Sequence, residues 1–204
     1  SCTYNLLTYL PGLKAKRVAV VAKGCDGKSV NVLVQENQIQ RDKLYVIGVS
    51  CPGIEQNGEK QRRCQSCDQH APSDADIVIG DAIDPNGSPD LAEVAEIEGK
   101  TATERLDFWL KQFDSCIRCY ACRQACPNCY CSECIVEQLL PEWVELPVDA
   151  LQNKMFHIIR AYHNAGRCIG CGECERACPM GIPLRLLNKK LAKDIKEMFG
   201  YLPG

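Results

Sequence analysis

The chain has 204 residues and a formal net charge of −2 at pH 7, from 24 basic and 26 acidic side chains. This length fits one medium domain or two small ones, and the balanced charge gives no reason to expect nucleic acid or an anionic membrane as a partner. No apolar run is long enough to insert directly into a membrane, and no basic-then-apolar leader opens the chain, so we expect a cytoplasmic protein. The 16 cysteines are the unusual feature, and their clustering favours metal ligation over the disulfides of small secreted domains.

The first part of the chain predicts a small α/β unit. Residues 16–22 are an apolar run typical of a buried strand, residues 27–37 predict a helix, and residues 44–49 predict a second strand. A strand, a helix and a strand at this spacing form a βαβ unit whose strands are parallel. Residues 75–80 predict one further strand.

Residues 81–99 differ in composition from the segments on either side. Turn-forming residues dominate from Asp84 to Pro89, and an acidic stretch follows them. This composition predicts a linker that ends the α/β part at residues 1–99 and leads to a second domain at residues 100–204.

The second part predicts helices around two cysteine-rich segments. Thr101 and Glu104 form a capping-box pattern at the start of the first helix. Two more helices are expected at residues 147–164 and 183–200, the former ending near Gly166. The helix at 147–164 is recognised by apolar residues at helical spacing, namely Val148, Leu151, Met155, Ile158, Ile159 and Tyr162.

The pattern Cys-x-x-Cys-x-x-Cys-x-x-x-Cys-Pro occurs twice, beginning at Cys116 and at Cys168. Three thiolates at steps of three let one tight loop hold three corners of a 4Fe-4S cluster, while the fourth cysteine serves the other cluster. A zinc site would use two Cys-x-x-Cys pairs around one tetrahedral ion and would leave the third cysteine unexplained. The expected ligands are Cys116, Cys119, Cys122 and Cys178 for one cluster, and Cys168, Cys171, Cys174 and Cys126 for the other.

Helices rather than short β-rich connections join these motifs. The fold class that we expect is therefore α+β, with a small βαβ part joined to an α-helical dicluster ferredoxin domain.

Three further cysteines, Cys129, Cys131 and Cys134, follow the first motif directly and have no place in the two-cluster scheme. They could be alternative ligands to the first set, an extra zinc or iron site completed by another residue, or thiols packed as small apolar side chains. The histidines are not at ligand spacing to any cysteine group, and Cys2 has no assigned role.

Four cysteines in the α/β part could form a third site. Cys25 and Cys51 each follow a predicted strand, and parallel strands end at the same sheet edge, so their thiols should be neighbours. Cys64 and Cys67 form a Cys-x-x-Cys hook that could return to that edge. Four converging thiols could hold a third 4Fe-4S cluster, with zinc as the main alternative.

Residues 22–29 fit the looser form of a nucleotide phosphate loop, ending in Lys28 and Ser29, between a strand and a helix. Asp81, at the end of a predicted strand, could then bind magnesium, and the chain would be an ATP-driven electron donor. An ordinary βα turn is the alternative, and the cysteine inside the loop and the small number of strands favour it.

Several of these segments together resemble a known family. They are Lys23–Asp26, the strand that ends at Cys51, the hook at Cys64 and Cys67, Ala75–Asp81, and the run from Cys116 to Cys131. Over roughly residues 15–180 the chain resembles the beta subunits of deazaflavin-coenzyme-reducing hydrogenases and of the matching formate dehydrogenases. The resemblance implies that Cys25, Cys51, Cys64 and Cys67 bind a 4Fe-4S cluster, which gives three clusters in all.

The resemblance also implies the cofactors and partners that we expect. The beta subunits of that family are longer and carry a flavin domain, near whose middle this chain begins, so flavin is not expected. The chain would relay single electrons to or from a larger catalytic redox subunit in a hetero-oligomer, without a catalytic site of its own. The iron–sulfur subunit of tungsten-dependent benzoyl-CoA reductase is similar in size and kind. The alternatives are a flavin-containing beta subunit and the ATP-driven donor.

Overall fold

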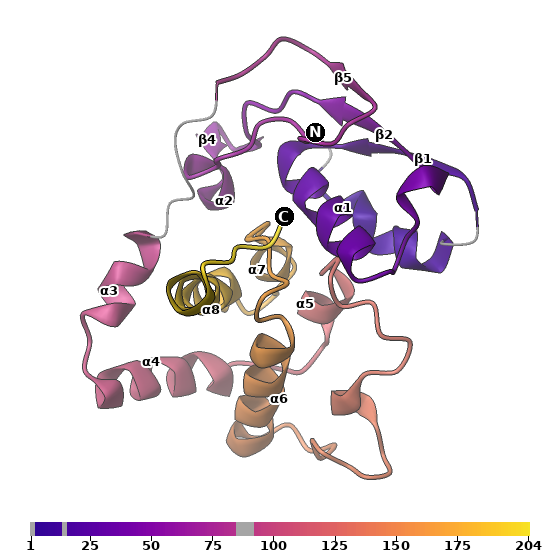
Figure 1. The fold of residues 1–204 in the computed structure, drawn as a ribbon. Coiled ribbons are helices and arrows are strands. Elements are labelled where there is room, and N and C mark those ends of the chain that lie inside the picture. Colours follow the sequence, from indigo (N-terminus) through magenta and orange to yellow (C-terminus); the bar gives the residue numbers. More distant parts are fainter. Residues whose placement is uncertain (1–2, 14–15, 85–91) are drawn as a thin grey trace.

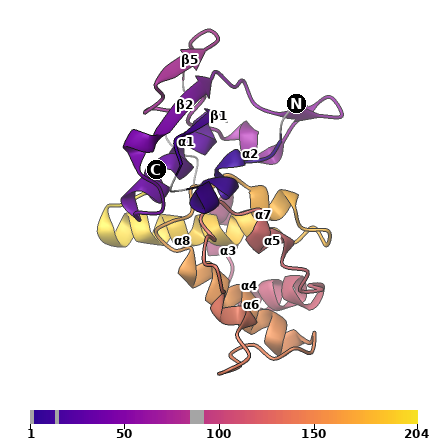
Figure 2. The same ribbon diagram turned by 90° about the vertical axis from the view of Figure 1, so that its right-hand side faces the viewer.

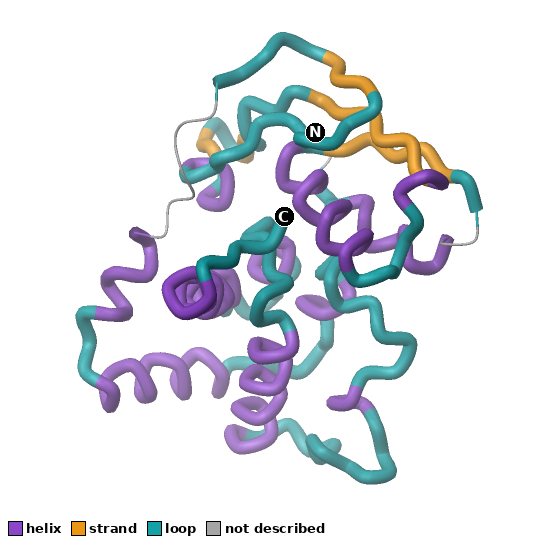
Figure 3. Tube along the Cα trace, viewed as in Figure 1, coloured by secondary structure: helices purple, strands orange, loops and turns teal. Residues whose placement is uncertain are grey.

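The strands of the described chain gather at one end of the molecule. The computed structural model describes residues 3–13, 16–84 and 92–204. The strands lie at one end, and the other end is built from helices and loops (Figure 3). This arrangement confirms the expected α+β class, with a small βαβ part joined to a helical part. None of the described helices is long and apolar enough to cross a membrane.

A three-stranded parallel sheet organises the first part. The strands pair in the order β1 (Val18–Ala22), β2 (Leu44–Val49) and β5 (Ile77–Ile79). The connection from β1 to β2 is α1 (Gly24–Gln35), which packs against the sheet as a βαβ unit requires (Figure 1). The 3-10 helix η1 (Leu6–Leu13) contacts both β1 and α1. Their common core consists of Leu7, Leu10, Val20, Ala22, Val30, Leu33, Ile39, Leu44 and Val46.

The helix after β1 begins at Gly24, three residues earlier than the sequence predicts. The carboxylate of Asp26 accepts a hydrogen bond from the backbone N–H of Lys23, 2.9 Å away, and so satisfies a donor at the start of the helix. An acidic side chain in the first turn also interacts favourably with the helix dipole. The early start places Cys25 in the first helical turn, at the end of β1.

Short elements lie between β1 and β5 and are missing from the sequence prediction. They are η2 (Arg41–Lys43), the hairpin strands β3 (Glu55–Gln56) and β4 (Glu59–Lys60), and the single turn α2 (Arg62–Gln65). Such short elements have no periodic pattern from which they could be recognised.

The expected linker is helical in its second half. Residues 85–91, which hold most of the turn-forming stretch, and Cys2 lie outside the described residues. Beyond them follow η3 (Ala92–Val94) and α3 (Ala95–Glu98). Val94 and Ile97 are buried against Leu186 of the last helix, so this segment is packed against the helical part.

The helical part contains the expected helices and a short one inside each cysteine motif. Its elements are α4 (Ala102–Asp114), α5 (Ala121–Gln124), η4 (Ile135–Glu137), α6 (Ala150–His163), α7 (Glu173–Arg176) and α8 (Leu184–Phe199). Thr101 caps α4 in the predicted capping box, and Gly200 ends α8 in a left-handed conformation. α8 lies between the sheet on one side and α4 and α6 on the other (Figures 1 and 2).

Most of the apolar residues by which α6 was predicted do not form its buried face, although Ile159 packs against the core. Leu151 is 61% exposed and Tyr162 is 67% exposed, whereas Asn153, His157 and Arg160 are buried. The helix itself is confirmed. Burying polar side chains is costly unless they are hydrogen-bonded or paired, so the inward face of α6 must have polar partners in the interior.

Candidate metal centres

The first predicted ligand set lies around one cavity. Cys116, Cys119, Cys122 and Cys178 all line it, although Cys178 belongs to the second motif. The rest of the lining is largely apolar and includes the buried side chains of Phe156, Ile182 and Leu184. Four thiols in an apolar surround are a donor set that suits an iron–sulfur cluster.

The second predicted ligand set lies around a second cavity. Cys168, Cys171 and Cys174 line it together with Cys126 of the first motif. Each motif therefore contributes its last cysteine to the cavity of the other, as the cross-ligation scheme expects. The packing of α5 against α7 brings the two motifs together.

Backbone conformations repeat between the two motifs. Arg118 and Tyr120 have φ of 47° and 58°, and the equivalent Gly170 and Gly172 both have φ of 71°. The left-handed residue before each short helix turns the chain tightly between successive cysteines. At Arg118, a residue that disfavours this conformation, the guanidinium donates hydrogen bonds to the carbonyls of residues 145, 146 and 147 and so holds the loop.

The inward face of α6 contacts both motifs. Nδ2 of Asn153 donates to the carbonyl of Cys116 at 2.8 Å, and Nη2 of Arg160 donates to the carbonyl of Cys122 at 3.0 Å. Further along, Oδ1 of Asn164 accepts weak hydrogen bonds from the thiols of Cys126 and Cys129, at 3.7 and 3.8 Å. One helix and its C-cap residue thus contact predicted ligands from both sets.

The motif thiols need a cation in order to ionise. Burial raises the pKa of Cys174 to about 12 and that of Cys122 to about 11, although the nearby Arg160 opposes both shifts. A thiol with such a pKa stays protonated at neutral pH unless a positive charge compensates the thiolate, and metal binding provides that charge. Every cysteine that the structure describes is a free thiol.

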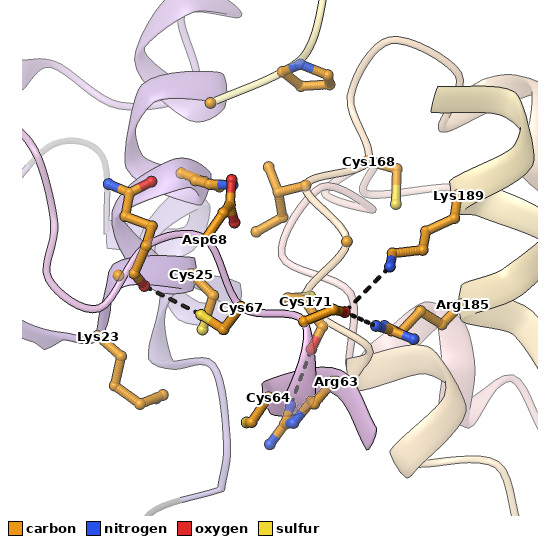
Figure 4. Close-up of a pocket in the computed structure, with 18 of the residues that line it drawn as sticks. Lys23, Cys25, Arg63, Cys64, Cys67, Asp68, Cys168, Cys171, Arg185 and Lys189 are labelled. Atoms are coloured by element: carbon orange, nitrogen blue, oxygen red, sulfur yellow. Dashed lines mark hydrogen bonds and ion pairs between the residues drawn. The ribbon is translucent and has the colours of Figure 1, made fainter. Parts of the chain in front are cut away.

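The four N-terminal cysteines also share one cavity, of about 260 Å³. Cys25, Cys51, Cys64 and Cys67 line it. Figure 4 shows Cys25, Cys64 and Cys67 on one side and Cys168 and Cys171 on the other. The cavity therefore lies between the α/β part and the second motif.

Two local features bring these N-terminal cysteines together. A Cβ atom at Gly24 would lie 1.9 Å from the carbonyl oxygen of Gln69, so only glycine lets the segment after Cys67 pass this close to α1. Cys51 and His70 are joined by two hydrogen bonds of 2.8 Å, from the Cys51 N–H to the His70 carbonyl and between the Cys51 carbonyl and His70 Nδ1.

A buried ion pair connects the N-terminal site to the second motif. Arg63 of α2 pairs with Glu173 of α7, and its guanidinium also donates to the carbonyl of Cys171 at 3.1 Å. The paired residues are far apart in the sequence, and nothing in the sequence indicated this contact.

Cys129, Cys131 and Cys134 line a further cavity with His163 and Arg167. Among residues 3–13, 16–84 and 92–204, no three histidine, cysteine, aspartate or glutamate side chains are arranged to hold a single metal ion. Cys129 is close to Cys126, whose thiol forms a hydrogen bond that lowers the pKa of Cys129.

The phosphate-loop residues are engaged in other contacts. Nζ of Lys28 lies 2.7 Å from one carboxylate oxygen of Asp68 and 2.8 Å from the other, and the hydroxyl of Ser29 accepts a hydrogen bond from Asn5. Asp81 is exposed. This arrangement favours the ordinary βα turn.

Sequence reasoning missed Asn153, Arg160 and Asn164, the polar residues that contact the motifs. The sequence does contain a pattern that could have indicated them. Together with His157 they recur at steps of three or four residues and so share one face of a helix. His157 itself stacks on Phe113, with ring centroids 4.4 Å apart, and lines the first-motif cavity.

Known proteins similar to this chain include a 4Fe-4S domain family and two formate dehydrogenase subunits. A family model described as a 4Fe-4S binding domain matches residues 160–183. The F420-dependent formate dehydrogenase subunit beta of Methanocaldococcus jannaschii is 28% identical over 286 residues, covering 94% of this chain and 75% of that protein. The F420-dependent formate dehydrogenase 1 subunit beta of Methanococcus maripaludis is 25% identical, covering 94% of this chain and 74% of that protein.

A shorter match supports the same assignment. The polyferredoxin protein MvhB of Methanothermus fervidus is 34% identical over 99 residues, covering 40% of this chain and 23% of that protein. The resemblance seen in the cysteine motifs is confirmed. The chain is therefore an iron–sulfur protein with a 4Fe-4S binding domain, homologous to the beta subunits of F420-dependent formate dehydrogenases.

Proposed function

We propose that this chain is an electron-transfer subunit that carries three 4Fe-4S clusters and has no catalytic site of its own. The observation that carries the proposal is that each of the three predicted sets of four cysteines lines one cavity, which groups twelve cysteines around three cavities. Single electrons pass readily between clusters held close together in a protein, and this is the chemistry that such a chain supplies. The proposed division of the chain is an α/β part at 1–99 with one cluster and a helical ferredoxin domain at 100–204 with two.

The cavities share residues, which supports an order for the three clusters. Cys168 and Cys171 line both the second-motif cavity and the N-terminal cavity. Arg160 lines the second-motif cavity and donates a hydrogen bond to the carbonyl of Cys122 in the first motif. The second-motif cluster is accordingly the middle one, with the N-terminal and first-motif clusters at the two ends.

Exposed apolar side chains beside the first motif support a protein partner there. Ile117 and Met180 line the first-motif cavity and are also exposed. Large exposed apolar residues continue along the loop before α6 and over its outward face, namely Leu139, Leu140, Trp143, Leu146, Val148, Leu151 and Tyr162. A patch of this kind marks an interaction site, and the proposed partner is a larger catalytic redox subunit in a hetero-oligomer.

The similarity of this chain to formate dehydrogenase beta subunits supports a place in a related oxidoreductase complex. The specific complex that we propose is a tungsten-dependent benzoyl-CoA reductase. The alignment with the 28% identical relative spans 286 residues, at least 82 more than the 204 residues of this chain, so parts of that relative have no counterpart here. This difference favours a relay without flavin. A flavin absorbance band in the purified protein would instead support the flavin-containing alternative.

The proposal is tested by removing the middle cluster. Cys174→Ala should lower the rate of electron transfer to the copurifying redox subunit by at least about tenfold, because the end clusters lose the relay between them. Cys131→Ala is the matched control, since this exposed cysteine belongs to none of the three sets. An unchanged rate in Cys174→Ala, with the middle cluster shown to be absent, would contradict a series of clusters.

A further inference from the structure

Arg160 is a buried cation without an acidic partner among the described residues. It is 7% exposed, and no carboxylate in residues 3–13, 16–84 and 92–204 forms an ion pair with it. Its Nη2 donates to the carbonyl of Cys122 at 3.0 Å, and its buried Nε has no hydrogen-bond partner.

Arg118 and Arg185, also buried in the described part of the chain, share the unpartnered Nε, but their other guanidinium nitrogens have more partners than those of Arg160. Arg185 forms a two-pronged ion pair with Glu93, with contacts of 2.5 and 2.9 Å. Arg118 donates to three backbone carbonyls that lie in a row. Removing a guanidinium from water costs free energy that several hydrogen bonds or an anion must offset. Within the described part of the chain Arg160 has one hydrogen bond and no carboxylate, so its position points to a negative charge that the side chains do not supply.

Cysteine sites surround Arg160. The side chain lines the cavity formed by Cys126, Cys168, Cys171 and Cys174, and it also borders the cavity of the three remaining cysteines. A 4Fe-4S core held by four thiolates carries a net negative charge, and the reduction of the cluster by one electron makes that charge more negative without forming or breaking a bond. A fixed cation beside the core, in a low-dielectric interior, favours the reduced state.

We propose that Arg160 is the charge-compensating residue of the second-motif cluster and raises its reduction potential. The inference rests on the proposed function, because it assumes that this cavity holds a cluster. Arg160 thereby sets the potential of the middle cluster relative to the two end clusters and adjusts the driving force for electron transfer along the chain.

The test is a redox titration of the cluster-loaded protein, followed by electron paramagnetic resonance. Arg160→Gln should lower the equilibrium constant for reduction of the second-motif cluster by at least tenfold, which is about 59 mV for a one-electron couple. Arg160→Lys keeps the charge and should stay within about threefold of the parent, or about 30 mV. Arg167→Met is the matched control, because this arginine is partly exposed and already paired with Glu36, so its loss should not shift the potential.

Each outcome decides the inference. An Arg160→Gln variant that keeps all its clusters at the parent potentials would overturn it. If Arg160→Gln loses the second-motif cluster, the Arg160→Lys variant decides. A Lys variant that keeps this cluster at the parent potential supports charge compensation. A Lys variant that also loses the cluster would overturn the inference and favour a role for the hydrogen bond to Cys122. Iron analysis separates the two proposals. A parent protein without clusters contradicts the proposed function. A parent that contains its clusters, together with an Arg160→Gln variant whose reduction potential is unchanged, contradicts this inference alone.

Discussion

Cys178 shows how single residues connect the two motifs. It follows the other cysteines of the second motif in the chain, yet it lies in the cavity of Cys116, Cys119 and Cys122. We predict that Cys178→Ala damages the first-motif cluster, since a cluster with three thiolates tends to lose one iron. A 3Fe signal should appear in electron paramagnetic resonance spectra, while the second-motif cluster survives.

Cys126→Ala is the reciprocal control for this prediction. Cys126 lies in the cavity of Cys168, Cys171 and Cys174, so its loss should damage the second-motif cluster and spare the first. If each substitution instead destroyed the cluster of its own motif, the ligands would be local and the cross-ligation scheme would be wrong.

A substitution of Lys28 tests whether residues 22–29 form a nucleotide phosphate loop. Because its ammonium group pairs with Asp68, we predict no measurable ATP binding by the parent protein in calorimetry. Lys28→Ala should leave electron transfer intact and should not change the absence of ATP binding. Micromolar ATP binding by the parent, abolished in the variant, would support an ATP-driven donor instead.

The grouping of the motif cysteines could be predicted because it depends on spacing within a short segment. Contacts between distant segments could not be predicted in this way. Cys-x-x-Cys steps fix which thiols one loop can bring together, whatever the rest of the fold does. The pair of Arg63 with Glu173, and the hydrogen bond from Arg160 to Cys122, join residues whose proximity depends on the packing of whole helices. No local pattern encodes such a distance.

At the scale of elements, α6 buries the polar side chains of Asn153 and Arg160 beside Phe156, while Leu151 and Tyr162 are exposed. Asn153→Leu leaves the carbonyl of Cys116 without this donor, whereas the carbonyl of Phe113 still accepts from the backbone N–H of Cys116. An unsatisfied buried acceptor costs about 1–3 kcal/mol. We therefore predict that this variant loses its clusters at a lower temperature than the parent, as followed by visible absorbance on heating.

Leu151→Ala is the control on the same helix. Its side chain is 61% exposed, and substitutions at such positions usually change stability by about 0.5 kcal/mol or less. Equal losses in the two variants would contradict a special contribution of the buried hydrogen bonds of Asn153, because both substitutions replace a residue by a better helix former.

Elements with periodic patterns were predictable, and single turns were not. The parallel βαβ unit, α4 with its capping box, α6 and α8 all follow from spacing and terminal residues. α5 and α7 lie inside the cysteine motifs, where the left-handed residues Tyr120 and Gly172, rather than any apolar period, set the start of each turn. The inward direction of the polar face of α6 could not be assigned, because apolar residues are normally expected to be the buried ones.

For the whole molecule, the outward face of α6 and the preceding loop form the proposed contact with a catalytic subunit. We predict that Leu151→Asp combined with Tyr162→Asp keeps the iron content but reduces copurification of the partner, because charges placed in an apolar interface must be desolvated. Glu59→Lys, in the β3–β4 hairpin, is a control change of charge on another exposed element. Unchanged copurification in the double variant would place the partner elsewhere.

The central claim is that the chain holds three 4Fe-4S clusters, and metal analysis of anaerobically purified protein tests it most directly. Three clusters contain about twelve irons and twelve acid-labile sulfides per chain, and the twelve cysteines that line the three cavities supply one thiolate for each iron. We predict values close to twelve for both, without stoichiometric zinc. About eight irons with one zinc would contradict the N-terminal cluster and leave only the two ferredoxin motifs.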